Sequence, residues 1–418
     1  MKICAIICEY NPLHYGHLQH IKESKELSGA DAIMCIMAGN FVQRGEPALV
    51  NKYVRARMAL DAGADIVVQL PTAYVCSSAE SFALAGVKIA NSFDNVTHLS
   101  FGCETKNHEL LQEVARFFAN EPEEYKVALK KYLDEGNSLV VSREKALEEL
   151  IKNDIVEFSE ITEVFNILRK PNNILAIEYL KALYKTDSKI QPIFSVRENS
   201  EYLSEVINGK DTSATAIRVK LASKPKASAV KKLIPSTSYK LLKDEMKSSG
   251  LPNLRLYSDI AMYMIKTTPS EELAEIYDVS EGLENRFKEK ATKIKDLNTL
   301  LLEVKSKRYT YTRLKRIVAG LVLGIKKDCV EELYKMKQLP FIKVLGFNNN
   351  NQTLLNEINC KTNLIIRNSN IVEKPSKLYK KLAQIEDNAN AVYNQLLTET
   401  TTIPDYAPDL YTKTIVYK

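Results

Sequence analysis

The stretch Ile3-Cys-Ala-Ile-Ile-Cys-Glu-Tyr-Asn-Pro-Leu-His-Tyr-Gly-His17 begins with an apolar run rich in isoleucine, which favours a buried strand. A segment with helical spacing follows at residues 18–27. Three more short runs with apolar residues follow, at residues 32–37, 66–70 and 98–101, of which the first two contain Ile or Val. Because further helical segments separate these runs, the sequence predicts an α/β fold, a Rossmann-like parallel sheet with right-handed crossovers.

The composition is that of a globular protein with a mild positive charge. The chain has 418 residues, 45% of them hydrophobic, which is enough for two or three domains with their own cores. Its 58 Lys and Arg residues exceed its 52 Asp and Glu residues, so the formal net charge is +6. An excess of this size permits a polyanionic partner but does not require one.

The seven cysteines and the apolar runs indicate the cellular compartment. The cysteines lie mostly in apolar runs and lack CxxC spacing, so we expect reduced thiols and neither a disulfide framework nor a metal site. The first apolar run is too short for a signal peptide, and no run of about 18 apolar residues is present. The sequence therefore predicts a cytoplasmic protein with no membrane span.

Two domains are expected from the distribution of the helical patterns. Residues 1–224 form the first, with a charged helical insertion at about residues 107–168 and a late strand at residues 190–196. Residues 225–418 form a second, mainly helical and basic domain, in which residues 341–347 are a short apolar segment. We predict neither an oligomeric state, nor a role for the insertion, nor one for the tail after Phe347.

His14 and His17 lie where the first strand turns into the first helix. A helix N-terminus presents unpaired backbone N–H groups and the positive end of the helix dipole, so it attracts phosphate. Gly16 allows the backbone to approach such an anion, and two imidazoles can stabilise charge that develops on a phosphorus centre. The alternatives are a metal-binding pair or two surface histidines.

A second helix start with hydroxyl side chains follows late in the first domain. The segment Ser213-Ala-Thr-Ala-Ile-Arg218 places Ser213 and Thr215 at this start and Arg218 within the first turns. Hydroxyl and guanidinium groups there can bind the β- and γ-phosphates of a nucleotide. An ordinary capped helix is the alternative when this segment is considered alone.

Six stretches with these features occur in one order, at residues 9–17, 37–47, 52–60, 101–104, 171–183 and 213–218. Together they resemble the bacterial tRNA(Met) cytidine acetate ligase family of the HxGH nucleotidyltransferase superfamily, over most of the chain to about Phe347. The resemblance implies that ATP activates acetate as acetyl-adenylate and that the acetyl group passes to N4 of the wobble cytidine of elongator tRNA(Met). Asn11 differs from the Asp that many small-molecule members of the superfamily carry at this position.

The resemblance also implies the site residues. His14, His17, Ser213 and Arg218 are the expected catalytic group, no protein metal ligand is expected, and Mg²⁺ would be held through the phosphates of ATP. The expected ATP-binding residues are Ile7, Cys8, Glu9, Tyr10, Asn11, Pro12, Leu13, His14, Tyr15, Gly16, His17, Leu18, Gln19, His20, Gly102, Asn172 and Arg197.

Two regions are candidates for binding acetate or RNA. Arg44 lies in the long loop at residues 39–47, where its charge could bind the carboxylate or meet the tRNA. Residues 305–316 contain six cations, two tyrosines and no acid, and we expect RNA contacts from Arg308, Tyr309, Arg313 and Arg316. The alternative is a basic helix end whose tyrosines belong to the core.

Two other functions remain open. One is a small-molecule adenylyltransferase that makes a dinucleotide cofactor, which leaves the basic helical half unexplained. The other is an RNA-binding protein that has lost catalysis, against which the intact His14, Gly16, His17, Ser213 and Arg218 argue.

Overall fold

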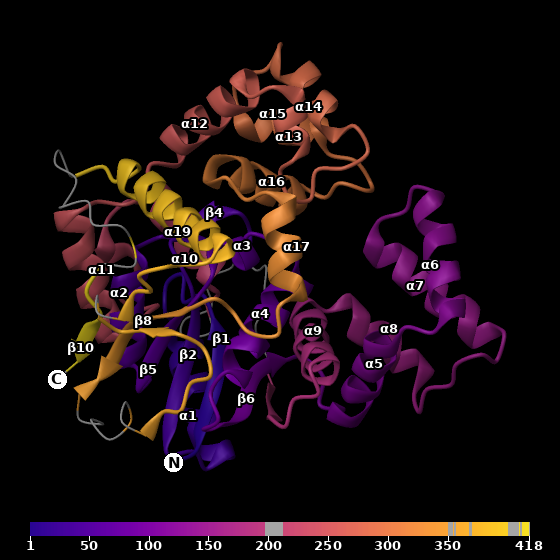
Figure 1. The fold of residues 1–418 in the computed structure, drawn as a ribbon, viewed down its shortest axis with the longest axis horizontal. Helices are drawn as coiled ribbons and strands as arrows, with labels where there is room; N and C mark the ends of the chain where they lie inside the picture. The colour runs from indigo at the N-terminus through magenta and orange to yellow at the C-terminus, as the bar shows by residue number, and fades with distance from the viewer. Residues whose placement is uncertain are drawn as a thin grey trace.

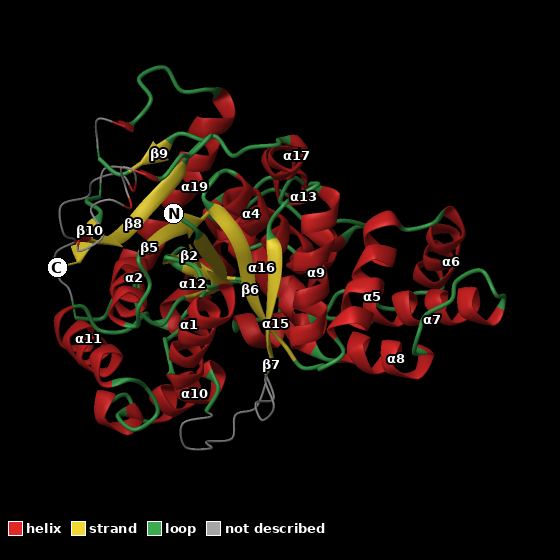
Figure 2. Ribbon diagram, turned by 90° about the horizontal axis from the view of Figure 1, so that it is seen from below, coloured by secondary structure: helices red, strands yellow, loops and turns green. Residues whose placement is uncertain are grey.

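A single large sheet lies at the centre of the protein (Figures 1 and 2). The structure, a computed structural model, describes residues 1–196, 212–349, 354, 357–367, 370–399, 409 and 412–417. The strand order is β10-β8-β5-β2-β1-β6-β7. The strands of the N-terminal half pair in parallel and are β1 (Ile3–Cys8), β2 (Ala32–Ala38), β5 (Ile66–Leu70), β6 (Val96–Cys103) and β7 (Gln191–Val196). This arrangement confirms the predicted fold class.

Strand β1 shows why both faces of the sheet are covered. Successive side chains of a strand point to opposite faces, and every residue from Ile3 to Ile7 is buried. Cys4 and Ile6 pack in the core with residues of α1 (Tyr15–Ser28), α2 (Lys52–Asp61) and α10 (Ala214–Ser223). Ile3, Ala5 and Ile7 pack in the other core, with α4 (Ala79–Asn91) and α9 (Pro171–Lys185).

The predicted insertion, residues 107–168, contains four consecutive helices that extend away from the sheet beside α9 (Figure 1). They are α5 (His108–Asn120), α6 (Glu123–Asp134), α7 (Leu139–Lys152) and α8 (Ile161–Arg169). Shorter elements lie near the sheet edge: β3 (Phe41–Val42) and β4 (Glu46–Pro47), which form an antiparallel hairpin, and α3 (Thr72–Val75).

Residues 225–418 differ from the prediction of a separate helical domain, because they also complete the sheet. Strand β8 (Ile342–Asn348) pairs antiparallel with β5, while β9 (Leu364–Ile365) and β10 (Ile415–Tyr417) pair parallel with β8. An apolar strand edge left open at β5 would expose unpaired backbone groups, and β8 covers it. The helices of this half are α11 (Ser236–Ser248), α12 (Leu254–Thr267), α13 (Ser270–Ala274), α14 (Leu283–Ala291), α15 (Leu297–Val304), α16 (Tyr311–Leu323), α17 (Lys327–Lys335) and α19 (Lys377–Gln395).

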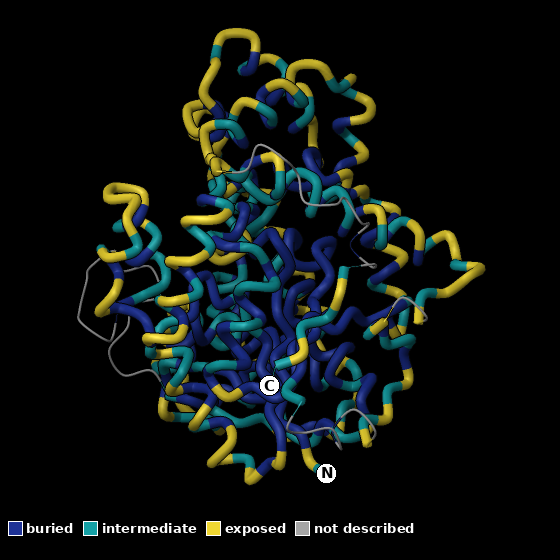
Figure 3. The backbone as a smooth tube through the Cα atoms, turned by 90° about the vertical axis from the view of Figure 1, so that its left-hand side faces the viewer, coloured by how far each residue is buried: buried dark blue, intermediate teal, exposed yellow. Residues whose placement is uncertain are grey.

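Burial follows this architecture. The continuous buried backbone runs through the sheet and the helices packed on it, while more exposed backbone marks the outer helices (Figure 3). Among the helices of the described residues, none combines the length and the apolar character that crossing a membrane requires.

Candidate active site

The turn between β1 and α1 presents two stacked imidazole rings. His14 is the N-cap of α1, and its Nδ1 accepts a hydrogen bond of 3.1 Å from the Gly16 N–H. The Nδ1 of His17 accepts a bond of 3.3 Å from the His14 N–H. The two rings stack with their centroids 3.7 Å apart and an angle of 28° between their planes. The helix start therefore holds both rings in one orientation.

This arrangement determines what the rings can do chemically. A neutral imidazole whose Nδ1 accepts a hydrogen bond carries its proton on Nε2, so each ring donates from Nε2. Two imidazolium cations about 3.7 Å apart would repel each other by roughly 4 kcal/mol at an effective dielectric constant of 20. The pair is therefore suited to donating hydrogen bonds to an anion rather than to carrying two positive charges.

The second helix start lies against the first through Arg218. Ser213 is the N-cap of α10 and accepts a hydrogen bond of 3.1 Å from the Ala216 N–H. The Arg218 guanidinium donates 2.8 Å to the carbonyl oxygen of Asn11 and 3.3 Å to Oγ1 of Thr215. Arg218 thus joins the β1–α1 turn to the first turn of α10, and the positive ends of two helix dipoles face one region.

A cavity of about 890 Å³ lies at this junction. Every residue from Ile7 to His20 except Pro12 and Leu13 lines it. Leu13 is fully buried and packs in the core with Tyr10 and Ile6. The remaining predicted residues in the lining are Arg44, Gly102, Asn172, Ser213 and Arg218. The structure therefore brings the separate sequence stretches together at the carboxyl edge of the sheet, where ligands of open α/β folds bind.

Arg55 connects the carboxyl ends of β1 and β2 next to the cavity. It is fully buried on α2 and donates to four backbone carbonyls, those of Val50 (3.0 Å), Glu9 (2.6 Å), Ala38 (3.1 Å) and Gly39. Burial lowers the pKa of Arg55 to about 10. Because Glu9 follows β1 and Ala38 ends β2, this one side chain fixes the carboxyl ends of the two strands beside the histidines.

The β3–β4 hairpin covers one side of the cavity. Its Gln43 N–H donates 2.7 Å to a carboxylate oxygen of Glu9, which ties the hairpin to the β1–α1 turn. Arg44 follows directly and lines the cavity, half-buried. The hairpin thus brings a guanidinium group to the space that His14 and His17 also face.

Helix α16 supports the hairpin from the other side. Gly45 has a φ of +72° and lies so close to α16 that a Cβ there would be 2.6 Å from the backbone nitrogen of Arg316. Glu46 forms an ion pair with Lys315, also on α16. Burial, together with the charge of Arg44, lowers the pKa of Lys315 to about 8. A glycine is required here by both the left-handed backbone and the close approach.

Comparisons with known proteins agree with this geometry. The family model described as HIGH Nucleotidyl Transferase matches residues 1–406. The tRNA(Met) cytidine acetate ligase of Acetivibrio thermocellus is 36% identical over 400 residues, which are 94% of each chain. That of Clostridium novyi is 39% identical over 369 residues, covering 88% of this chain and 89% of its own. The chain belongs to the tRNA(Met) cytidine acetate ligase family.

Solved structures of Thermotoga maritima TmcAL share the fold over the full length of both chains. The apo crystal form has a TM-score of 0.89 at 28% identity. The crystal form bound with alpha-thio ATP has a TM-score of 0.87 at 27% identity. The family predicted from the six motif stretches is thus confirmed.

Of the ATP-binding residues predicted beyond the β1–α1 turn, the structure describes Gly102 and Asn172 at the cavity. Asn172 is the second residue of α9, and its backbone N–H and Nδ2 donate 3.0 Å and 2.6 Å to one oxygen of Glu104. Glu104, directly after β6, therefore orients the Asn172 amide at the cavity wall. Nε2 of His20 lies 3.0 Å from Oγ of Ser100, so part of its hydrogen bonding is to β6. Arg197 lies outside the described residues.

The predicted RNA contacts are mostly engaged within the protein. Tyr309 is only 6% exposed, and its hydroxyl donates 2.8 Å to the Ser280 carbonyl, an environment that matches the alternative of a core tyrosine. Arg308 pairs with Glu281, and Arg313 pairs with Asp278 at 2.8 Å.

Arg316, another predicted RNA contact, is half-buried. Burial lowers its pKa, with the nearby Arg313 charge acting in the same direction and Asp278 opposing it. The acids that pair with Arg308 and Arg313 lie 27 and 35 positions earlier in the chain, and Glu46, which pairs with Lys315, lies much further away, so no local sequence pattern indicates these pairs. Lys305 and Lys307, from the same segment, are exposed.

Sequence reasoning did not single out Arg55 as a structural residue. A signal was present, because Arg55 lies three and four positions before the apolar residues Met58 and Ala59, on one helix face. Cys8, predicted to bind ATP, lines the cavity, and burial raises the pKa of its thiol well above the usual range. A thiolate nucleophile is therefore disfavoured at this position.

Proposed function

We propose that this protein uses ATP to activate acetate as acetyl-adenylate and then acetylates N4 of the wobble cytidine of elongator tRNA(Met). The observation that carries the proposal is the stacked His14–His17 pair at the start of α1, facing the same cavity as Ser213 and Arg218. The names of the relatives and the alpha-thio ATP complex of the Thermotoga protein support it.

In the first step an acetate oxygen attacks the α-phosphorus of ATP, and the bond to the bridging oxygen of pyrophosphate breaks. Nε2–H groups of His14 and His17 donate to the α-phosphoryl oxygens, where negative charge increases. The N-terminus of α10 with Ser213 binds the β- and γ-phosphates, and Arg44 pairs with the carboxylate. The protein contributes position and electrostatics, and no covalent enzyme intermediate is needed.

Magnesium enters this scheme as a companion of ATP. Among the described residues, no three His, Cys, Asp or Glu side chains are grouped as a metal site. We propose that Mg²⁺ is held by the phosphate oxygens of ATP and by water, and that its charge would offset that of the phosphates.

In the second step the exocyclic amine of cytidine attacks the acyl carbon, AMP leaves, and the amine loses one proton. An anticodon base is unpaired, so it can enter the cavity without breaking a duplex. Residues 225–418 supply the tRNA-binding surface, and the exposed Lys305 and Lys307 are its candidate phosphate contacts.

Acetate-dependent pyrophosphate release, measured with and without an unmodified elongator tRNA(Met) transcript, tests both steps. Mass analysis of the anticodon nucleosides then identifies the product. N4-acetylcytidine establishes the whole reaction. Pyrophosphate release that requires a phosphorylated substrate in place of acetate would instead identify the cofactor-forming adenylyltransferase, and no release under any condition would refute the adenylation step.

A further inference from the structure

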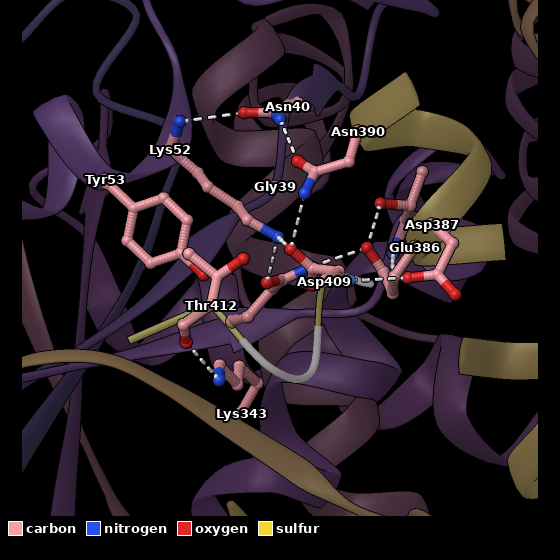
Figure 4. A network of polar contacts seen from close by, with 12 residues as sticks. Gly39, Asn40, Lys52, Tyr53, Lys343, Glu386, Asp387, Asn390, Asp409 and Thr412 are labelled. Carbon is pink, nitrogen blue, oxygen red and sulfur yellow. Dashed lines mark hydrogen bonds and ion pairs between the residues drawn. The ribbon is translucent and has the colours of Figure 1, made fainter. Parts of the chain in front are cut away.

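A buried polar network includes Asn40, the residue that precedes the β3–β4 hairpin (Figure 4). Lys52, the first residue of α2, is 1% exposed, and its Nζ donates 2.9 Å to Oε1 of Gln69 on β5. The same Nζ forms an ion pair with Asp409, which is also buried. The backbone N–H of Lys52 donates 2.8 Å to Oδ1 of Asn40, the residue before the hairpin. Lys52 therefore connects Asn40, at the base of the hairpin, to Asp409, which lies 357 positions after Lys52 in the chain.

Helix α19 supplies the other side of this network. Asn390 accepts 2.6 Å from Nδ2 of Asn40 and donates 3.0 Å to Asp409 (Figure 4). Asp387 accepts 2.6 Å from the backbone N–H of Asp409. The segment at Asp409 is thus attached to α19 through side chain and backbone, and α19 is attached to Asn40.

Glu386 of α19 connects this network to the carboxyl end of β5. Its two oxygens accept from the N–H of Thr72 (2.6 Å), from Oγ1 of Thr72 (2.7 Å) and from Nε2 of Gln69 (2.5 Å). A Cβ on Gly39 would lie 3.1 Å from Nε2 of Gln69 and 3.2 Å from Oγ1 of Thr72. The chain that leaves β2 for the hairpin therefore runs in tight contact with groups that Glu386 orients.

We propose that Asp409 and Asn390 are positioning residues of the active site, which hold the β3–β4 hairpin and its Arg44 over the cavity through Lys52 and Asn40. Neither residue lines the cavity, so neither is placed to touch a substrate. Their influence passes through Asn40, whose carbonyl accepts 2.9 Å from the Ala48 N–H and so closes the hairpin base. The kinetic consequence of this role rests on the proposed function, whereas its structural consequence does not.

The structural test measures amide hydrogen exchange of peptides covering residues 40–48 in the full chain. Asp409→Asn keeps an oxygen that can accept from Asn390 but removes the charge that neutralises Lys52. Its control is Asp65→Asn, because Asp65 is also a buried aspartate but lies at the amino end of β5. Asn390→Ala removes the hydrogen bonds to both Asn40 and Asp409 and leaves the Lys52–Asp409 ion pair in place. Its control is Asn388→Ala, on the same helix, whose side chain donates 3.0 Å to the Leu323 carbonyl instead.

We expect exchange in residues 40–48 to accelerate on the order of tenfold in Asp409→Asn and in Asn390→Ala, and to stay unchanged in both controls. Unchanged protection in Asn390→Ala, or equal acceleration in Asn388→Ala, overturns the proposal. Should Asp409→Asn fail to fold, the Asn390 and Asn388 pair decides alone.

The kinetic test measures acetate-dependent ATP–pyrophosphate exchange. Asn390→Ala should raise the KM for acetate several-fold with a smaller change in kcat, and should add little to the effect of Arg44→Ala in the double variant. Full additivity of the two substitutions contradicts action through Arg44. Absence of exchange in the wild type refutes the proposed function, while the hydrogen-exchange result still decides the positioning role.

Discussion

His14 caps α1, and we propose that it also donates a hydrogen bond to the α-phosphoryl group; one substitution separates these two roles. Asparagine is among the best N-cap residues, so His14→Asn preserves a side-chain acceptor for the first turn of α1. Its amide is shorter than imidazole and cannot bring a donor to the place of Nε2. The variant therefore removes the donor and keeps the cap.

The expected magnitudes differ for the two roles. Loss of one preorganised donor to developing charge lowers a rate by about 10²- to 10³-fold, equivalent to about 3–4 kcal/mol of transition-state stabilisation. Loss of a cap costs about 1 kcal/mol of folding stability. His14→Asn should show only the first effect, and His14→Ala should show both.

Acetate-dependent ATP–pyrophosphate exchange and urea unfolding measure the two quantities on the same samples. His98→Asn, a matched substitution on β6 at a residue that does not line the cavity, should leave exchange unchanged. Exchange by His14→Asn within about threefold of the wild type would refute the donor role. Unfolding of His14→Asn at as low a urea concentration as His14→Ala would refute the separation of the two roles.

Three further outcomes are expected. Arg55→Met should lose on the order of 4 kcal/mol of unfolding free energy in urea, because four carbonyl acceptors lose their donor. Arg57→Met, on the same helix, should lose less than about 1 kcal/mol, and equal losses in the two variants would contradict this explanation. Burial raises the pKa of Glu386 to about 7, so the folded state binds this proton more tightly than the unfolded state. The free energy of unfolding should therefore fall by on the order of 3 kcal/mol from about pH 4.5 to 7, and Glu386→Gln should lack this dependence. The double variant Lys305→Glu with Lys307→Glu should weaken tRNA binding and reduce its salt slope, and an unchanged slope in filter-binding assays would exclude phosphate contacts there.

The parts of the fold that sequence reasoning predicted are those set by local patterns. Strand β1 and the start of α1 follow from an apolar run, a turn and a capping residue within fifteen positions. The site at the carboxyl edge follows because parallel strands end on the same side of the sheet. His14, Ser213 and Arg218 could therefore be placed together before the structure was known.

What remained hidden depends on contacts between distant residues. Lys52 and Arg55 have the composition of a surface helix, and only Asp409 and the carbonyl groups around Gly39 explain their burial. In the sequence Tyr309 resembles a residue that contacts RNA, but in the structure its hydroxyl donates to the Ser280 carbonyl. Local spacing contains no information on these pairings.

The antiparallel strand β8 has a consequence for synthesis of the chain on the ribosome. Strands β1, β2 and β5 emerge early, but the edge of β5 gains its partner only when residues 342–348 leave the exit tunnel. Until then the nascent sheet presents an open apolar edge, the kind of surface that chaperones bind and that neighbouring chains can capture. Emergence of β8, rather than synthesis of the parallel strands alone, is thus the event that covers this edge of the sheet.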